Sequence, residues 1–182
     1  MGWTCKLHGG VASGLGAVLL TMAALTWLPG TLPWGEAQWP VVTAFALALV
    51  IFVAAMARMV LTGADRGTMW RAFRCLPGRA QAGLAVLAVS AATILALGMA
   101  GTDLQAPEAR DGRYYAYDTS PRGTVEIPES EYRALQESGL RMMLAIPGLL
   151  LVTAAGTVLA AGELRRADRG QKTGVPFTGG SR

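Results

Sequence analysis

The stretch VVTAFALALVIF (residues 41–52) decides the fold of this chain, because a helix of that composition has almost no polar face to offer to water. It belongs to the second of four long apolar runs, which cover residues 11–28, 40–61, 82–100 and 142–162. Each run has about the 17 to 25 residues that a helix needs to cross the hydrocarbon layer of a bilayer. The sequence therefore predicts an all-α membrane fold with four transmembrane helices.

The composition supports this prediction. Hydrophobic residues make up 52% of the chain and charged residues 15%, and the mean hydropathy is +0.38, which exceeds that of ordinary soluble domains. The first run could instead be a secretory signal, because Lys6 precedes it and residues 35–37 have the small-x-small form of a cleavage site. The run is longer than a usual signal core and ends well before that site, so we expect it to be a span.

The distribution of basic residues predicts the orientation. Lys and Arg near the ends of spans are retained in the cytoplasm. Segments 62–81 and 163–182 carry an excess of them, whereas 29–39 has none and 101–140 has eight acids against four arginines. We therefore expect a multi-pass protein of the cytoplasmic (plasma) membrane with both termini in the cytoplasm.

Two parts of the chain follow from this layout. Residues 1–172 form the predicted four-helix transmembrane domain, which includes residues 101–141 as an extracytoplasmic cap loop between the third and fourth helices. Residues 173–182 are rich in Gly and polar side chains and are predicted to be a disordered cytoplasmic tail.

Within the cap loop, residues 102–112 are polar, contain a proline and are expected to be irregular. Residues 113–117 and 124–127 have strong strand propensity and are separated by turn-forming residues, which predicts a β-hairpin. Pro128 and the acids that follow it favour the start of a helix. We expect that helix to pack against the hairpin and to continue into the fourth span.

The tyrosines of this loop are the candidate partner-binding residues. Strand alternation places Tyr115 and Tyr117 on one face of the hairpin and Tyr114 on the other, while Tyr132 lies on the helix. Packing and anchoring at the membrane interface are the common roles of such residues. Binding of a partner is the functional alternative for Tyr114, Tyr115, Tyr117 and Tyr132.

The same loop resembles a pattern in uncharacterised bacterial four-span integral membrane proteins. The pattern is a Tyr-Tyr strand, a short turn, a Val-containing strand and a Glu-Tyr helix that enters the next span. The matching residues are Tyr114, Tyr115, Val125, Glu131 and Tyr132. The resemblance implies a bacterial cytoplasmic membrane and carries no known activity.

A second group of residues is predicted to anchor the chain in the membrane. Arg58 is the only ionisable side chain within the four runs, and it lies close enough to the cytoplasmic end to snorkel, although a functional charge facing a cavity is the alternative. In segment 62–81, apolar side chains alternate with arginines before Pro77, which predicts a short interfacial helix. Specific lipid or partner binding is the alternative role there. The candidate anchoring residues are Arg58, Trp70, Arg71, Arg74, Arg165, Arg166 and Arg169.

Small residues predict how the spans pack. Gly10 with Gly14, and Gly156 with Ala160, are small-xxx-small pairs of the kind that lets helix backbones approach closely. We expect both pairs to pack within the molecule, with self-association as the alternative. Pro147 is expected to kink the fourth span.

Little in the sequence predicts chemistry. Cys5, Cys75 and His8 are far from any metal-site or redox spacing, and the carboxylates of the cap loop lack a pocket that would set their pKa values apart. The runs hold no acid or histidine of the kind that ion-coupled carriers place near the midplane. We expect no enzyme activity, no cofactor and no nucleic-acid partner.

These observations favour a non-catalytic accessory, sensory or protective interaction protein that uses its extracytoplasmic loop. Its expected partners are the lipid bilayer, a membrane or extracytoplasmic protein, and further copies of itself. The alternative is a small oligomeric transporter or pore subunit that uses Thr-lined helix surfaces and the bend at Pro147.

Overall fold

The computed structural model describes residues 3–28, 39–63, 65–100, 103–120 and 122–173, with the side chains of Arg66 and of 168–173 left aside. Within these residues, four helices are long and apolar enough to cross a membrane, which confirms the four predicted helices. They are α1 (Trp3–Leu25), α2 (Trp39–Thr62), α4 (Gly78–Met99) and α5 (Glu129–Thr173).

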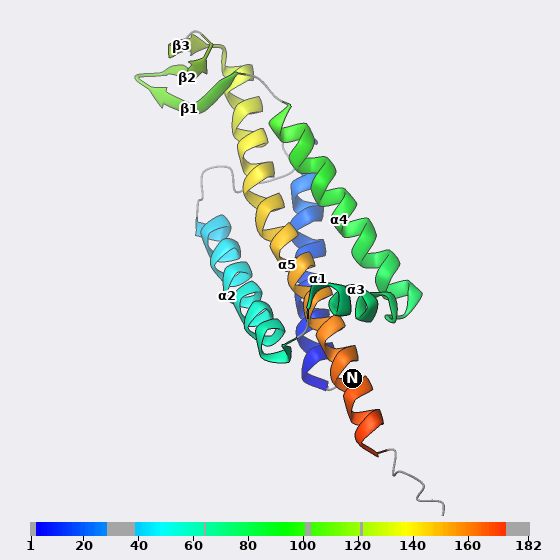
Figure 1. Cartoon of the computed structure of the whole chain (residues 1–182). Coiled ribbons are helices and arrows are strands. Elements are labelled where there is room, and N and C mark those ends of the chain that lie inside the picture. The colour runs from blue at the N-terminus through cyan, green and yellow to red at the C-terminus, as the bar shows by residue number, and fades with distance from the viewer. Residues whose placement is uncertain (1–2, 29–38, 64, 101–102, 121, 174–182) are drawn as a thin grey trace, which may run out of the picture.

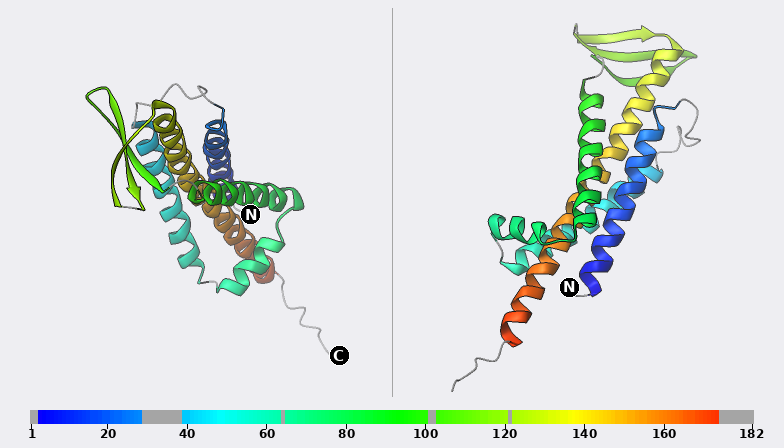
Figure 2. Two further views of the ribbon diagram at one scale, coloured as in Figure 1. Left: turned by 90° about the horizontal axis from the view of Figure 1, so that it is seen from above. Right: turned by 90° about the vertical axis from the view of Figure 1, so that its right-hand side faces the viewer.

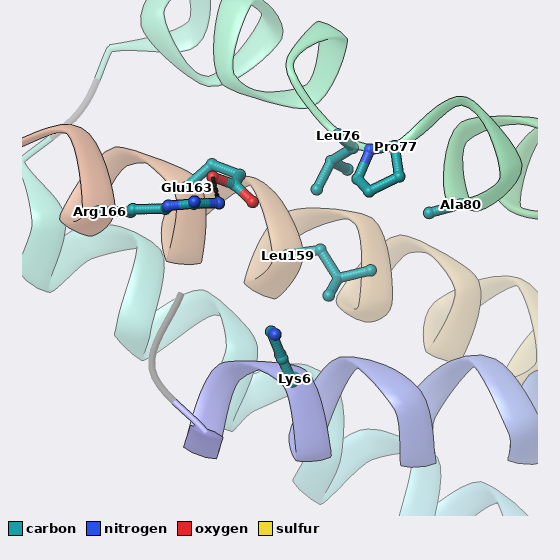
Figure 3. A pocket seen from close by; sticks show the side chains of 7 residues that line it. All are labelled: Lys6, Leu76, Pro77, Ala80, Leu159, Glu163 and Arg166. Carbon is teal, nitrogen blue, oxygen red and sulfur yellow. Dashed lines mark ion pairs between the residues drawn. The ribbon is translucent and has the colours of Figure 1, made fainter.

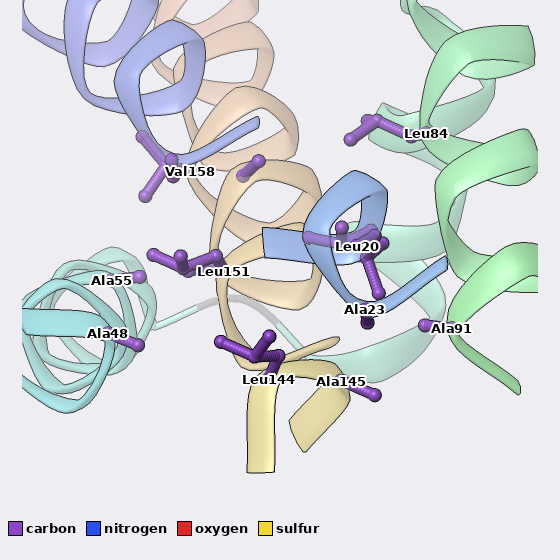
Figure 4. Close-up of a cluster of buried hydrophobic side chains, with 14 of the residues drawn as sticks. Leu20, Ala23, Ala48, Ala55, Leu84, Ala91, Leu144, Ala145, Leu151 and Val158 are labelled. Carbon is purple, nitrogen blue, oxygen red and sulfur yellow. The ribbon is translucent and has the colours of Figure 1, made fainter. Parts of the chain in front are cut away.

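The central element is α5, and the other three long helices pack against it (Figure 1). Seen along the bundle, α5 lies among α1, α2 and α4 (Figure 2, left). Leu151, Val158 and Pro147 of α5 are the largest fully buried side chains. In Figure 4, Leu151 lies close to Ala48 and Ala55 of α2. The middle of the bundle is therefore occupied by α5 itself.

The contact between α1 and α5 depends on glycine. A Cβ atom added to Gly16 would lie 3.2 Å from Val152 Cγ2, and one added to Gly9 would lie 2.7 Å from Leu159 Cγ. The prediction that Gly10 and Gly14 pack within the molecule was wrong, because nothing lies within 4 Å of a Cβ added at either position. Gly9 and Gly16 lie on one face of α1, and Gly10 and Gly14 lie on the adjacent face. Their spacing in the sequence does not show which of the two faces contacts α5.

The other predicted pair does lie within the molecule. Ala160 is buried, and a Cβ at Gly156 would lie 3.9 Å from a ring carbon of Phe73. Phe73 belongs to α3 (Arg66–Arg74), the short helix predicted in segment 62–81. α3 runs crosswise to the long helices near one end of the bundle (Figure 1), and Pro77 begins the turn into α4.

The outer surfaces of α2 and α4 are strongly apolar. α2 buries only Ala48 and Ala55, and α4 buries only Leu84, Ala91 and Ile94. Their large outward side chains are exposed, including Val42, Val50, Val53, Val60 and Leu61 on α2 and Val86, Val89 and Leu97 on α4. An apolar surface of this extent is typical of proteins surrounded by lipid.

At the other end of the bundle, a three-stranded antiparallel sheet lies beside the start of α5 (Figure 2, right). The predicted hairpin is confirmed as β2 (Arg113–Thr119) and β3 (Arg122–Ile127). The prediction that residues 102–112 are irregular was wrong, because β1 (Leu104–Arg110) pairs with β2.

Two local features explain β1. Pro107 has no N–H to donate, and it is tolerated because it lies on an edge strand in the register shift between Gln105 and Glu108. Asp111 and Gly112 have φ values of 52° and 76°, the positive pair required by a two-residue type I′ hairpin turn. Asp-Gly is a strong hairpin signal that the sequence already contained.

The predicted continuation of the cap helix into the fourth span is confirmed, because α5 is one helix from Glu129 to Thr173. Pro147 lies inside it, and the bend expected there stays a prediction. Of the predicted disordered tail, Thr173 is still helical and 174–182 lie outside the described residues. The cleavage site considered at 35–37 also lies outside them.

Candidate interaction sites

The inner face of the sheet packs on α5. The rings of Tyr114 and Tyr132 lie 4.7 Å apart between centroids with their planes tilted by 33°. Ala116, two residues along the same face of β2, is almost completely buried, as is Ile127 at the end of β3. Tyr114 and Tyr132 are therefore brought together, and each fills part of the sheet–helix contact.

The outer face of the sheet carries the other two tyrosines. The strand register places Tyr115 between Glu108 and Glu126, and Tyr117 between Gln105 and Thr124. Tyr117 is 41% exposed and is, among the described residues, the one large apolar side chain of the sheet with such exposure. The predicted alternation of the tyrosines is thus confirmed by their positions on β2.

Charged side chains flank Tyr115 on this face. Arg113 lies 3.6 Å from Glu126, and Arg110 lies 3.0 Å from Glu108, in ion pairs that are well exposed to solvent. Exposed pairs of this kind contribute little to stability, so their side chains can rearrange at small cost when another surface approaches. The outer face combines aromatic area with adaptable charges, a composition typical of protein interfaces.

Arg141 connects the start of the apolar part of α5 to the residues that follow α1. Its Nε donates to Thr26 Oγ1 at 2.8 Å, and its guanidinium lies 4.8 Å from the centroid of the Trp27 ring. Thr26 is only 2% exposed, and its own hydroxyl donates to the carbonyl oxygen of Ala23 at 2.7 Å. These bonds hold α5 against α1 just below the sheet.

The opposite end of the bundle holds the predicted anchoring residues of α3. Trp70 is exposed and stacks on Phe73 with ring centroids 5.8 Å apart. Arg71 and Arg74 lie in the last turn, where the negative end of the helix dipole favours cations. Asp65 caps the first turn by accepting from the Thr68 amide at 3.1 Å, and the hydrogen bonds from Thr68 lower the pKa of this carboxyl.

The remaining anchoring candidates lie near the same end. Arg58 is half-buried, and its Nη1 lies 4.0 Å from Cys5 Sγ, so its guanidinium extends towards α1. Arg165 and Arg166 are exposed on α5. Arg169 also belongs to α5, but its side chain is outside the described part of the structure. The anchoring role of all these residues stays a prediction.

Two neighbouring cavities lie at this end beside α5. One of about 430 Å³ lies between α1, α5 and the α3–α4 turn, with Lys6, Leu76, Pro77 and Leu159 among its lining residues (Figure 3). The other, of about 740 Å³, lies between α3 and α5 and includes Thr68, Arg71 and Cys75. Glu163 and Arg166 line both cavities, and their side chains approach to 3.9 Å.

The hydroxyl groups expected to line a transport path bond to their own helices. Thr153 Oγ1 donates to the carbonyl of Leu149, and Thr157 Oγ1 to that of Thr153. Thr21 and Thr43 do the same on α1 and α2. Such bonds satisfy each hydroxyl within its own helix.

The two cysteines considered for metal or redox chemistry lie on different elements. Cys5 is buried on α1, and Cys75 is exposed just after α3; both thiols are free. His8 Nε2 is buried without a hydrogen-bond partner. In the part of the chain that the structure describes, no three metal-ligating side chains of His, Cys, Asp or Glu gather.

No protein-family model, curated protein or solved structure matches this chain. The resemblance of the Tyr-rich loop to bacterial four-span membrane proteins therefore stays an expectation, and the function must be inferred from the two ends of the bundle.

Proposed function

We propose that this is a non-catalytic, multi-pass protein of the bacterial cytoplasmic membrane that binds another protein through its cap. The cap consists of β1–β3 and the first two turns of α5. It would act as an accessory, sensory or protective component, with the sheet outside the cytoplasm and α3 on the cytoplasmic side.

The tryptophans support the membrane placement. Trp27 at the end of α1 and Trp39 at the start of α2 are exposed on the sheet side of the bundle. Trp3 and Trp70 are exposed near the opposite end. Tryptophan is enriched at both interfaces of a bilayer, so the two pairs fit the boundaries of the hydrocarbon layer. The excess of arginine at the α3 end supports a cytoplasmic position for that end.

The observation that carries the binding proposal is the outward face of β2. Tyr115 and Tyr117 point away from α5, while Tyr114 on the inner face fixes the sheet to Tyr132. A pre-positioned aromatic face loses little conformational entropy when it binds, and tyrosine is enriched at interface centres. The continuous α5 would place this face at a fixed height above the membrane.

Thiol labelling in intact cells tests the orientation. Cys75 is exposed at the α3 end, so a membrane-impermeant maleimide should label it only after the cells are permeabilised. A cysteine that replaces Thr124 on the outer face of β3 should be labelled without permeabilisation. Labelling of Cys75 from outside the intact cell would invert the proposed orientation.

Co-purification tests the binding role. The full-length protein and its Tyr115→Ala/Tyr117→Ala variant would be isolated from membranes under the same conditions. We expect the double variant to lose a protein partner that the parent retains. Trp70→Ala is the matched control, because it removes an exposed aromatic ring from the opposite end. Equal partner recovery from parent and double variant would contradict the proposal.

A further inference from the structure

We propose that the groove between α1, α3 and α5 binds the headgroup of an anionic phospholipid, whose phosphate is held by Lys6 and Arg166. The groove consists of the two cavities that share Glu163 and Arg166. This site is separate from the cap and holds whether or not the cap binds a protein.

The groove brings together residues that are remote in sequence. Lys6 extends from α1 towards α5, where Leu159, Glu163 and Arg166 lie, and Leu76 and Pro77 close the space from the α3–α4 turn (Figure 3). Three separate parts of the chain therefore supply its walls. A group of surface cations on one helix would lack these walls.

The charges favour a single phosphate. The two cavities are lined by three cations, Lys6, Arg71 and Arg166, and by one acid, Glu163, which leaves a surplus of two positive charges. The Glu163 side chain is 17% exposed and lies 3.9 Å from Arg166, so it helps to orient that guanidinium. Arginine and lysine are the usual phosphate-binding side chains, the first as a planar fork and the second as a point charge.

The apolar wall distinguishes a lipid from a soluble phosphate. Leu76, Pro77, Ala80 and Leu159 offer no side-chain hydrogen-bonding group, yet they line the same cavity as Lys6 and Arg166. The glycerol and the first acyl carbons of a phospholipid would cover this wall. Residues of α3 line one of the two cavities. This helix crosses the bundle near one end (Figure 1), as an amphipathic helix does when it rests among headgroups. Basic pockets of this kind between helices bind anionic headgroups.

The test uses the full-length protein in nanodiscs of phosphatidylcholine with a minor fraction of phosphatidylglycerol. After extraction into mild detergent, native mass spectrometry would count the lipids that remain bound. We expect one phosphatidylglycerol to be retained in preference to phosphatidylcholine. Lys6→Gln and Arg166→Gln should each reduce its retention by about fivefold, because each removes one cation from the phosphate.

Arg79→Gln is the matched control, since it removes an exposed cation at the same end without lining either cavity. Retention that falls equally in the control and the groove variants would overturn the proposal in favour of diffuse surface attraction. Ala80→Leu should also reduce retention by filling the apolar wall while leaving the charge unchanged. Displacement of the lipid by inorganic phosphate alone would overturn the lipid assignment. An unchanged circular dichroism spectrum would show that each variant is folded.

Discussion

The first turns of α5 pack against a hydrogen-bonded sheet, whereas its turns around Gly156 and Glu163 lie beside a nine-residue helix and several cations. At the sheet end, polar backbone is satisfied between strands, and aromatic contact holds the sheet to the helix. At the α3 end, charges and an amphipathic helix surround two open cavities. The two ends of α5 therefore differ: hydrogen bonds and ring contacts order the sheet end, whereas charged side chains dominate the α3 end.

Under the two proposals, this difference would decide what each end binds. A sheet with fixed side-chain positions can match the shape of one protein surface. Cations on flexible side chains match any surface of phosphates, and a cavity adds selectivity for one headgroup.

The largest effect is expected in the middle of the bundle. Gly16→Leu would place side-chain atoms against Val152 and the Gly148 carbonyl, where a Cβ already approaches to 3.2 and 3.3 Å. We expect it to lower the unfolding free energy by about 3 kcal/mol. Denaturation in sodium dodecyl sulfate, followed by circular dichroism, measures this. Gly14→Leu, which points into open space, should change little, and an equal loss in both variants would show that α1 faces α5 differently.

The next largest effect is expected where the sheet end joins the bundle. Arg141→Ala removes the hydrogen bond to the buried Thr26 and the contact with Trp27, so we expect a loss of about 2 kcal/mol. The same denaturation experiment applies. Arg133→Ala is the control. It removes an ion pair with the exposed Glu129 on the same helix, so the substitution should cost about 0.5 kcal/mol or less.

A smaller and local effect is expected within the cap. Tyr114→Ala removes the aromatic contact with Tyr132, which contributes about 1 kcal/mol beyond its buried area. Hydrogen exchange of the β2 amides should become faster, while exchange in the buried part of α5 stays unchanged. Tyr117→Ala on the outer face should leave β2 exchange unaltered. If both variants loosen β2 equally, the two faces of the sheet do not have separate roles.

The smallest effect is expected at the exposed start of α3. The pKa of Asp65 is lowered in the folded protein because Thr68 donates to its carboxylate. Its contribution is therefore present above the unfolded pKa and is lost as the pH falls through the lower folded pKa. Asp65→Ala should slightly destabilise α3 at neutral pH and weaken its acid dependence, whereas Asp65→Asn should keep the cap without that dependence. Hydrogen exchange of the α3 amides across this pH range measures both effects.

The sequence predicted the features that depend on neighbouring residues. Continuous apolar runs predicted the four long helices, and the alternation of Tyr114, Tyr115 and Tyr117 predicted the two faces of β2. The error at β1 arose because Pro107 was treated as a strand breaker, although an edge strand with a bulge accepts proline. The turn at Asp111 and Gly112 was the overlooked signal.

The contacts between residues that are distant in the sequence could not be predicted from it. A shift of one residue turns a helix by about 100°, so the choice between Gly9 and Gly10 as the inward position needed the position of α5. Arg141 and Thr26 are separated by 115 residues, and no local pattern joins them. The groove likewise needs Lys6, Pro77 and Glu163 to be brought together by the fold.

The most direct test places the same photoreactive residue at Tyr117 on the sheet or at Trp70 on α3, followed by irradiation of intact membranes. If the two ends recognise different partners, Tyr117 should yield a specific protein adduct that is lost when Tyr115 is changed to Ala. Trp70 should yield phospholipid. Capture at Tyr117 of only lipid, or only a second copy of this chain, would contradict protein binding by the cap and would favour an oligomeric pore or transporter.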